Sequence, residues 1–143
     1  KPKHSPDYFH QKLGRILWNA CGMSREQQSL KVAMKDISEL ESEFWQNIKV
    51  TGSESDFNQT LEKAGRVADF IELGYLMCRD AIEREESCGA HARVEYLAES
   101  GDAKRDDENY SHVAAWEFQD GGPILHKEDL LFEFIKPSVR DYK

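Results

Sequence analysis

Cys88 and His91 stand three residues apart in a Cys-Gly-Ala-His run, a spacing that suits either half a zinc site or a nucleophile with its base. A structural zinc takes four ligands, usually Cys or His, but the other four histidines are scattered singly along the chain. A catalytic cysteine would also need an oxyanion site and an orienting partner, and the neighbouring residues supply neither. We therefore favour a tight glycine turn at a helix end, where polar groups satisfy the freed backbone carbonyls.

Two charged runs are the other candidates for chemistry. Arg84-Glu85-Glu86 and Arg105–Glu108 carry the groups that dicarboxylate binding or a proton relay would use. Such runs are more often solvated faces or surface ion pairs, which is the interpretation we favour for these residues by themselves. The sequence contains no glycine-rich phosphate loop of either the Gly-x-Gly-x-x-Gly or the Walker type. The residues alone therefore predict no assembled active site.

The composition narrows the class of protein. The chain has 143 residues, which fits one domain, and 19 basic against 27 acidic residues give a net charge of −8. An acidic surface repels phosphate, so we expect neither nucleic-acid binding nor direct membrane contact. No apolar run approaches the roughly 20 residues of a membrane span. The sequence opens at Lys1 without a methionine or a signal-peptide pattern, and we expect a processed product or an excised fragment.

The three cysteines indicate the redox compartment. Cys21, Cys78 and Cys88 are an odd number and cannot all pair within the chain, which fits a reducing, cytoplasmic environment. Cys21 and Cys78 fall on apolar helical faces, where a free cysteine behaves as a small hydrophobic residue.

Helical periodicity predicts three helices that would position these groups. The first spans about 7–21 and ends at Gly22, a natural left-handed stop. The second runs to about residue 47 from a capping box formed by Ser24 and Gln27. The third spans about 56–86 with Asp56 as its N-cap. Its predicted seam consists of Phe57, Leu61, Ala64, Ala68, Ile71, Tyr75, Cys78 and Ile82.

The pattern changes after Ser87. Residues 99–109 are almost wholly polar and read as a loop. Residues 112–118 read as a strand, Asp120-Gly121-Gly122-Pro123 as a turn, and 124–126 as the returning strand of an antiparallel hairpin near 112–127. The predicted fold is mainly α: an up-down-up three-helix bundle at about 7–87, a turn, loop and hairpin at about 88–135, and an extended tail at 136–143.

Five segments in order along the chain resemble the succinate dehydrogenase and fumarate reductase flavoprotein family. Residues 84–93 resemble its Glu-Ser-Arg-Gly-Ala-His signature, 105–109 its Arg-Asp-Asp motif and 112–116 its His-x-x-x-Trp strand. Residues 13–25 are similar to a family helix, and 136–142 to its C-terminal ending. The family signature falls on eleven residues here, to which the resemblance gives a structural or interface role: Glu86, Ser87, Gly89, His91, Arg93, Arg105, Asp106, Asp107, Asn109, His112 and Trp116.

The resemblance implies that this chain is the C-terminal helical domain of a larger subunit. In that family the parent interconverts succinate and fumarate, with FAD bound covalently in another domain and the dicarboxylate held between flavin-binding and capping domains. No catalytic, cofactor-binding or metal residue carries over to this chain, and the isolated fragment is expected to be inactive. Cys88, where most members have Arg, and Tyr110, where Trp is commoner, resemble the branch that pairs the flavoprotein with an iron–sulfur subunit and one di-haem cytochrome b membrane subunit. The parent complex is then expected on the cytoplasmic side of the inner membrane.

Two alternatives remain beside this reading. L-aspartate oxidase shares the bundle and a similar turn, and a free-standing helical interaction module belongs to a different class. The aromatic residues Trp116, Phe118, Phe132 and Phe134 lie in a C-terminal region too thin to bury them all. We therefore expect part of this region to be an exposed face that packs on the flavin domain, with Arg105–Glu108 at its polar rim.

Overall fold

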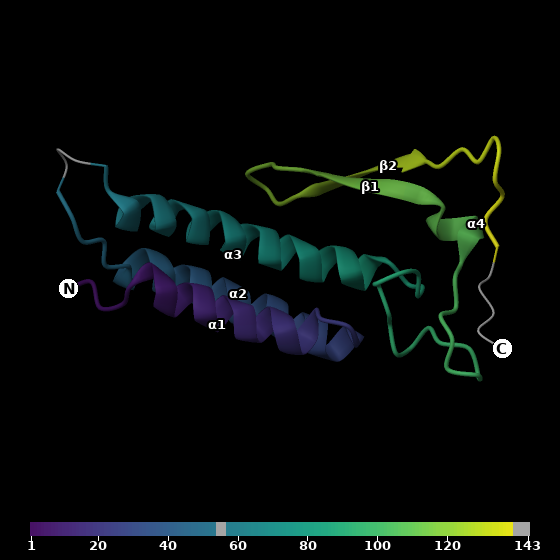
Figure 1. Ribbon diagram of the computed structural model, residues 1–143, viewed down its shortest axis with the longest axis horizontal. Coiled ribbons are helices and arrows are strands. Elements are labelled where there is room, and N and C mark those ends of the chain that lie inside the picture. The colour runs from purple at the N-terminus through teal and green to yellow at the C-terminus, as the bar shows by residue number, and fades with distance from the viewer. Residues whose placement is uncertain (54–56, 139–143) are drawn as a thin grey trace.

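The computed structural model describes residues 1–53 and 57–138, which form three long helices and a two-stranded hairpin (Figure 1). The helices are α1 (Pro6–Ala20), α2 (Gln27–Asn47) and α3 (Gln59–Glu83). A short helix α4 (Asp107–Tyr110) precedes strands β1 (His112–Glu117) and β2 (Ile124–Asp129). The up-down-up bundle followed by an antiparallel hairpin is the predicted fold.

The bundle core is built from the apolar stripe of each long helix. α1 contributes Phe9 and Leu13, and the ring of Phe9 meets that of Phe44 on α2 edge to face at 5.2 Å between centroids. α2 buries its predicted stripe from Leu30 through Phe44. α3 packs on α1 at Gly74, where an added Cβ would lie 3.2 Å from the Leu13 and Leu17 side chains. The α1–α3 contact therefore depends on the absence of a side chain at that position.

Three details of the predicted helix ends are wrong. Gly22 is not left-handed; it is required because a Cβ there would lie 2.6 Å from the Trp18 carbonyl oxygen. Ser24 does not cap α2, which begins after Glu26, because Arg25 pairs with the distant segment 92–94 through two backbone hydrogen bonds of 2.9 Å. α3 ends at Glu83 rather than near 86.

The start of α3 also differs from the prediction. The predicted cap Asp56 lies outside the described residues, and the Asn58 side chain accepts a 3.0 Å hydrogen bond from the Leu61 N–H instead. Phe57 and Leu61 are 82% and 59% exposed, so the buried seam begins only at Ala64. The apolar periodicity therefore extends to Phe57 and Leu61, which the neighbouring helices do not cover.

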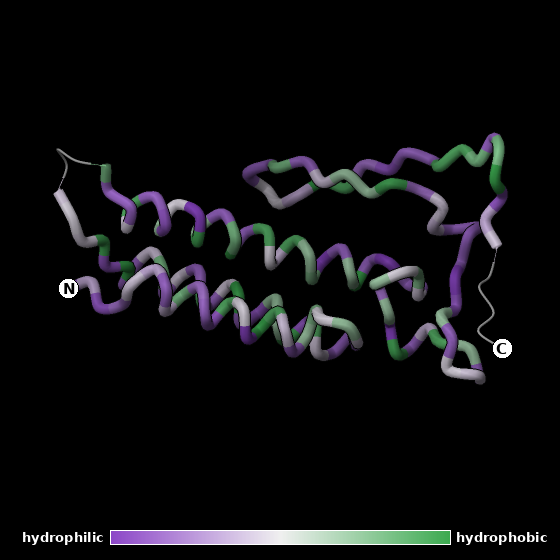
Figure 2. The backbone as a smooth tube through the Cα atoms, viewed as in Figure 1, coloured by the Kyte–Doolittle hydropathy of each residue, from purple (hydrophilic) through white to green (hydrophobic). Residues whose placement is uncertain are grey.

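The hairpin lies beside α3 and continues into an apolar segment that leaves the bundle. β1 pairs with β2 in antiparallel register, with Trp116 opposite Leu125, and the predicted turn contains Gly122 at φ +113°. The next segment, residues 130–135, is green in Figure 2 and runs along the outer side of the molecule away from the helices. Within the described ranges no helix is long and apolar enough to cross a bilayer.

Candidate functional site

The signature residues gather where α3 ends, in a polar junction formed by residues 84–93 and 105–112. Its centre is Arg93, which is only 1% exposed. The Arg93 guanidinium donates through Nη1 to the carbonyls of Ala81 at 2.7 Å and Ile82 at 3.2 Å, which the end of α3 leaves without helical partners. Ser87, also buried, accepts from the Arg93 N–H at 2.8 Å and donates to the Arg93 carbonyl at 3.1 Å. Arg93 therefore caps the helix from within the protein.

His91 completes the cap of α3 and connects it to the segment between α1 and α2. Its Nδ1 lies 2.9 Å from Arg25 Nη1, and its Nε2 lies 2.9 Å from the Arg84 carbonyl oxygen. Since a guanidinium can only donate, Nδ1 is the acceptor and Nε2 carries the proton. Burial lowers the pKa of His91, and the charges of Arg25, Arg93 and Arg84 lower it further, against the hydrogen bond to the Arg84 carbonyl.

Both ring nitrogens of His91 are thus committed, so the imidazole is not placed to serve Cys88 as a base. The two residues are instead joined through their backbones, with Cys88 N–H to His91 carbonyl at 2.9 Å and the reverse bond at 3.0 Å. Gly89 lies between them at φ +59°, as predicted for the turn. In residues 1–53 and 57–138 no three His, Cys, Asp or Glu side chains gather in a metal-binding group.

Glu86 contradicts the interpretation of its charged run as a solvated face. Its side chain is 3% exposed, and Oε2 accepts a 2.8 Å hydrogen bond from the backbone N–H of Asp106. Oε1 lies 3.6 Å from Arg84 Nε. The carboxylate therefore joins the end of α3 to the Arg105–Glu108 run, and it is buried because this contact supplies its hydrogen-bond donor.

Residues 105–110 form part of the junction and include the helix α4 in a stretch predicted to be a loop. The Asp106 carboxylate accepts from the Asn109 backbone N–H at 3.2 Å and from its side-chain amide at 2.9 Å. This Asp-x-x-Asn spacing is an N-cap signal that the sequence contains. Arg105 binds Asp107 through two nitrogens and donates through Nη1 to the Ser138 carbonyl at 3.1 Å, which holds the start of the tail.

Side-chain contacts of Trp116, Arg79 and Arg84 attach the first strand to α3 and to the residue that follows α3. Trp116 Nε1 donates to Asp80 Oδ1 at 2.8 Å, while the Arg79 guanidinium lies over the indole ring at 5.2 Å from its centroid. Arg84 Nη2 donates to the His112 carbonyl at 3.3 Å. Trp116 is half-buried in this contact, and His112 is bound through its backbone carbonyl.

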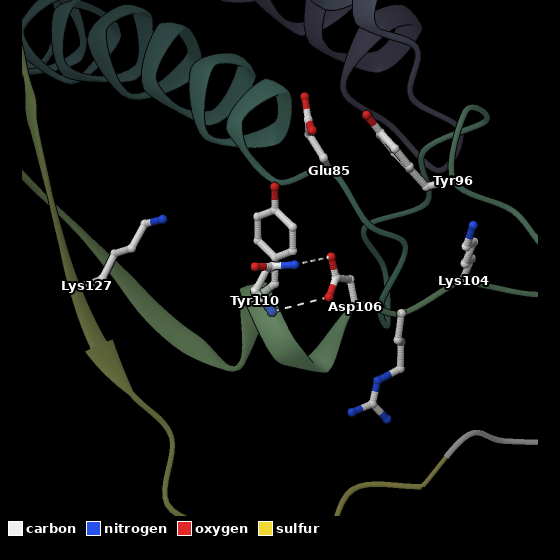
Figure 3. A pocket seen from close by; sticks show the side chains of 8 residues that line it. Glu85, Tyr96, Lys104, Asp106, Tyr110 and Lys127 are labelled. Carbon is white, nitrogen blue, oxygen red and sulfur yellow. Dashed lines mark hydrogen bonds between the residues drawn. The ribbon is translucent and has the colours of Figure 1, made fainter.

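An open cleft of about 610 Å³ lies beside the junction (Figure 3). Its lining comes from the end of α3, the loop, α4 and β2: Glu85, Tyr96, Lys104, Arg105, Asp106, Asn109, Tyr110 and Lys127. Both oxygens of the Asp106 carboxylate, whose two hydrogen bonds are dashed in Figure 3, accept from Asn109 and are used in capping. The cleft mixes both signs of charge and presents no arranged set of donors for one ligand.

The junction does not fit a flavin. A dinucleotide phosphate is held where a glycine-rich turn opens a helix after a strand. The glycines with positive φ in the described ranges are at 52, 89, 101 and 122, each alone in a turn and none of them at the start of a helix after a strand. The arrangement is instead that of a structural junction, because its buried charged side chains form hydrogen bonds with backbone groups.

Four residues that help to hold the junction or its neighbours in place were not among the predicted site residues. Arg25 and Arg84 hold His91, Glu95 accepts from the Gln27 N–H at 2.6 Å, and the Tyr110 hydroxyl lies 3.3 Å from the Glu83 carbonyl. Arg25 and Arg84 lie within the segments compared with the family and Tyr110 directly follows one, but no local pattern indicates that Glu95 caps a helix 68 positions away.

Comparison with known proteins agrees with this geometry. The family model described as "Fumarate reductase flavoprotein C-term" matches residues 10–142. The fumarate reductase flavoprotein subunit of Haemophilus influenzae is 30% identical over 132 residues, covering 92% of this chain and 21% of that subunit. A solved E. coli quinol fumarate reductase mutant matches with a TM-score of 0.80 and 23% identity, over 96% of this chain and 23% of the other. The fold is therefore that of the C-terminal part of such proteins.

The alternative family is the weaker match. An L-aspartate oxidase of Nostoc is 29% identical over 100 residues, which is 62% of this chain, against 92% for the Haemophilus subunit. The chain spans about a fifth of the length of the curated relatives that it matches.

Proposed function

This chain belongs to the family of fumarate reductase flavoprotein C-terminal domains, and we propose that it is the C-terminal helical domain of a larger succinate dehydrogenase/fumarate reductase flavoprotein subunit. Its parts are the bundle at about 7–87, the turn, loop and hairpin at about 88–135, and the tail at 136–143. The parent uses FAD to interconvert succinate and fumarate. This domain supplies no catalytic residue and supports the flavin-binding domain.

The observation that carries the proposal is the exposed apolar surface after the junction. Phe132 is 46% exposed and Phe134 94%, and Leu131 and Ile135 beside them are more than 80% exposed, while Phe118, at the turn that forms the other end of the hairpin, is 74% exposed. A lone domain seldom exposes so many large apolar side chains in one region unless they belong to an interface. The polar junction holds this segment in place, through Arg105 and Ser138, without covering it.

The partners of the proposed domain follow from its proposed place in a larger flavoprotein subunit. The aromatic surface packs on the flavin-binding and capping domains of its own subunit, and an inter-domain contact of this kind typically buries about 600–1,500 Å². The covalent FAD lies in the flavin domain, and an iron–sulfur subunit and a cytochrome b membrane subunit complete the parent complex. The complex is placed on the cytoplasmic side of the inner membrane.

The proposal is tested by producing the chain with and without the flavoprotein segment encoded before Lys1. We expect the chain alone to bind neither FAD nor succinate, as measured by absorbance near 450 nm and by calorimetry. Produced as separate polypeptides, the two parts are expected to co-elute on size exclusion, with all the flavin on the upstream part. Flavin on the isolated chain, succinate-dependent dye reduction by it, or an upstream sequence without a dinucleotide-binding opening would contradict the proposal.

A further inference from the structure

Two of the three cysteines face each other inside the bundle. Cys21 directly follows α1 and is 6% exposed, and Cys78 lies near the C-terminal end of α3 and is 0% exposed. Both belong to the same buried cluster, and each thiol is close enough to the other to shift its pKa. Two neighbouring thiols on separate helices can form a disulfide with each other.

The helix packing independently places these side chains together. α1 and α3 run in the same direction and approach closely at Gly74, where an added Cβ would lie 3.2 Å from Leu17 Cδ1. Cys78 follows Gly74 by four residues, and Cys21 follows Leu17 by four. Because residues four apart lie on one helix face, the close contact at Leu17 and Gly74 is repeated one turn further at Cys21 and Cys78.

We propose that Cys21 and Cys78 are a reversible oxidation site that forms a disulfide between α1 and α3 when the protein meets a peroxide. The bond would link the first and third helices across a loop that includes all of α2. This inference concerns the bundle and does not depend on the function proposed above.

Cys21 is the thiol that reacts first. The hydrogen bond from the Cys78 thiol and the nearby Arg25 charge lower the pKa of Cys21 to about 7, although burial opposes them. A thiolate is therefore available at neutral pH, and it is the reactive form. Cys21 also follows the last residue of α1 and is the more exposed of the pair, at 6% against 0%, so a small uncharged oxidant such as hydrogen peroxide reaches it first.

The step balances with one peroxide per pair. The Cys21 thiolate attacks one peroxide oxygen, the O–O bond breaks, and Cys21 becomes a sulfenic acid while the other oxygen leaves and is protonated to water. Cys78 sulfur then attacks Cys21 sulfur and displaces the sulfenic hydroxyl, which leaves as a second water with the Cys78 proton. Two thiols lose two electrons, and one peroxide gains them.

Cys88 provides an internal comparison because it lies in the turn beside His91, away from the bundle, and is half-buried. In Cys88→Ser only the proposed pair remains. In Cys78→Ala, Cys21 has no partner, and oxidation should stop at the sulfenic acid or proceed to the sulfinic acid. Cys78→Ser keeps a polar group of similar size, should the alanine variant fold poorly.

The experiment treats the folded wild-type chain and Cys88→Ser with a slight excess of hydrogen peroxide at pH 7.5. Thiols are counted in denaturant, and the cross-link is mapped by peptide mass spectrometry. We expect the count to fall from three to one in the wild type and from two to none in Cys88→Ser, with a Cys21–Cys78 peptide 2 Da lighter than the sum of its parts. Dithiothreitol should restore the thiols.

The oxidised protein is also expected to melt at a temperature higher by about 5 °C or more, because the cross-link closes a long loop in the unfolded chain. The proposal is overturned if both thiols of Cys88→Ser survive the treatment. It is equally overturned if Cys21 goes to the sulfinic acid in the wild type without a cross-linked peptide, or if the only disulfide formed joins Cys88 residues of two molecules.

Discussion

At the scale of single residues, the signature turn is a set of buried polar groups that satisfy backbone atoms. Arg93 and His91 supply donors to carbonyls at the end of α3, and Glu86 accepts from a backbone N–H of the following segment. Buried charges of this kind are costly unless every partner is in place. We therefore expect substitutions in the turn to act first on stability and only through it on the parent enzyme.

Gly89→Ala should lower the free energy of unfolding by about 1 kcal/mol or more, because Gly89 has φ +59°, a conformation that alanine adopts with strain. The open space around Gly89 excludes a steric cause, since nothing lies within 4 Å of an added Cβ. Urea unfolding of the isolated chain measures the difference. Gly121→Ala is the matched control, with equal space but no positive φ. Equal stability of the Gly89 variant and wild type would show that the turn needs no left-handed residue.

His91 should make stability depend on pH in a definite direction. Burial lowers the pKa of His91 in the folded chain below its ordinary value of 6.5. The unfolded chain then binds the proton first, so the stability contribution is complete above pH 6.5 and is lost as the pH falls toward the folded pKa. Protonation at Nδ1 would also oppose Arg25, which donates there.

We expect His91→Gln to show a smaller loss of stability than wild type between pH 7.5 and pH 5.5, although its stability at pH 7.5 is lower. Urea unfolding at the two pH values gives both quantities. An identical pH dependence in His91→Gln and wild type would show that the His91 imidazole does not titrate in this window.

At the scale of elements, the ends of the helices are fixed by contacts from elsewhere in the chain. α2 begins where Arg25 leaves its pairing with residues 92–94, and its first N–H is capped by the Glu95 carboxylate at 2.6 Å. Burial raises the pKa of Glu95, but hydrogen bonds from the Gln27 N–H and Arg93 lower it overall, which keeps the capping carboxylate charged. The N-terminus of α2 and the signature turn are therefore one structural unit.

Glu95→Ala should cost about 1 kcal/mol of stability, the usual effect of removing a helix N-cap. Ser24→Ala should cost much less, because the Ser24 side chain is not the cap of α2. Thermal unfolding of the two variants beside wild type compares them directly. The reverse order, with Ser24→Ala the less stable, would place the cap at Ser24 as the local capping-box pattern predicted.

At the scale of the whole molecule, the chain has a bundle with a buried core, although Trp18 and Trp45 are exposed on its surface, and a C-terminal region with little buried apolar area. The bundle buries both aromatic and aliphatic stripes, whereas residues 130–135 run outside it with most side chains exposed (Figure 2). The uneven burial is expected for a domain whose second half packs against a larger partner. The hairpin alone would be marginal in water, and its hydrogen bond from Trp116 to Asp80 joins it to α3.

Phe134→Ser should leave the stability of the isolated chain unchanged within about 0.5 kcal/mol, because Phe134 is 94% exposed there. It should weaken association with the separately produced flavin domain by about tenfold or more, as expected for an aromatic residue within an interface. Calorimetric titration measures the affinity. Trp45→Ser, an exposed aromatic on α2, is the control and should bind as wild type does. Equal affinities for Phe134→Ser and wild type would place the interface elsewhere.

The sequence by itself determined the three amphipathic helices and the hairpin, because helical spacing and the Asp-Gly-Gly-Pro turn act within a few residues. It also determined the left-handed Gly89 and, through its motifs, the family. Only the tertiary structure decided where α2 and α3 begin and end. Glu95 caps the start of α2 and Arg93 the end of α3, and the other caps are side chains at positions that the periodicity does not mark. It likewise decided that Glu86 is buried and that Cys21 meets Cys78. Both outcomes depend on which segments are brought together in space, and hydrogen-bond partners distant in sequence leave no periodic signal in the chain.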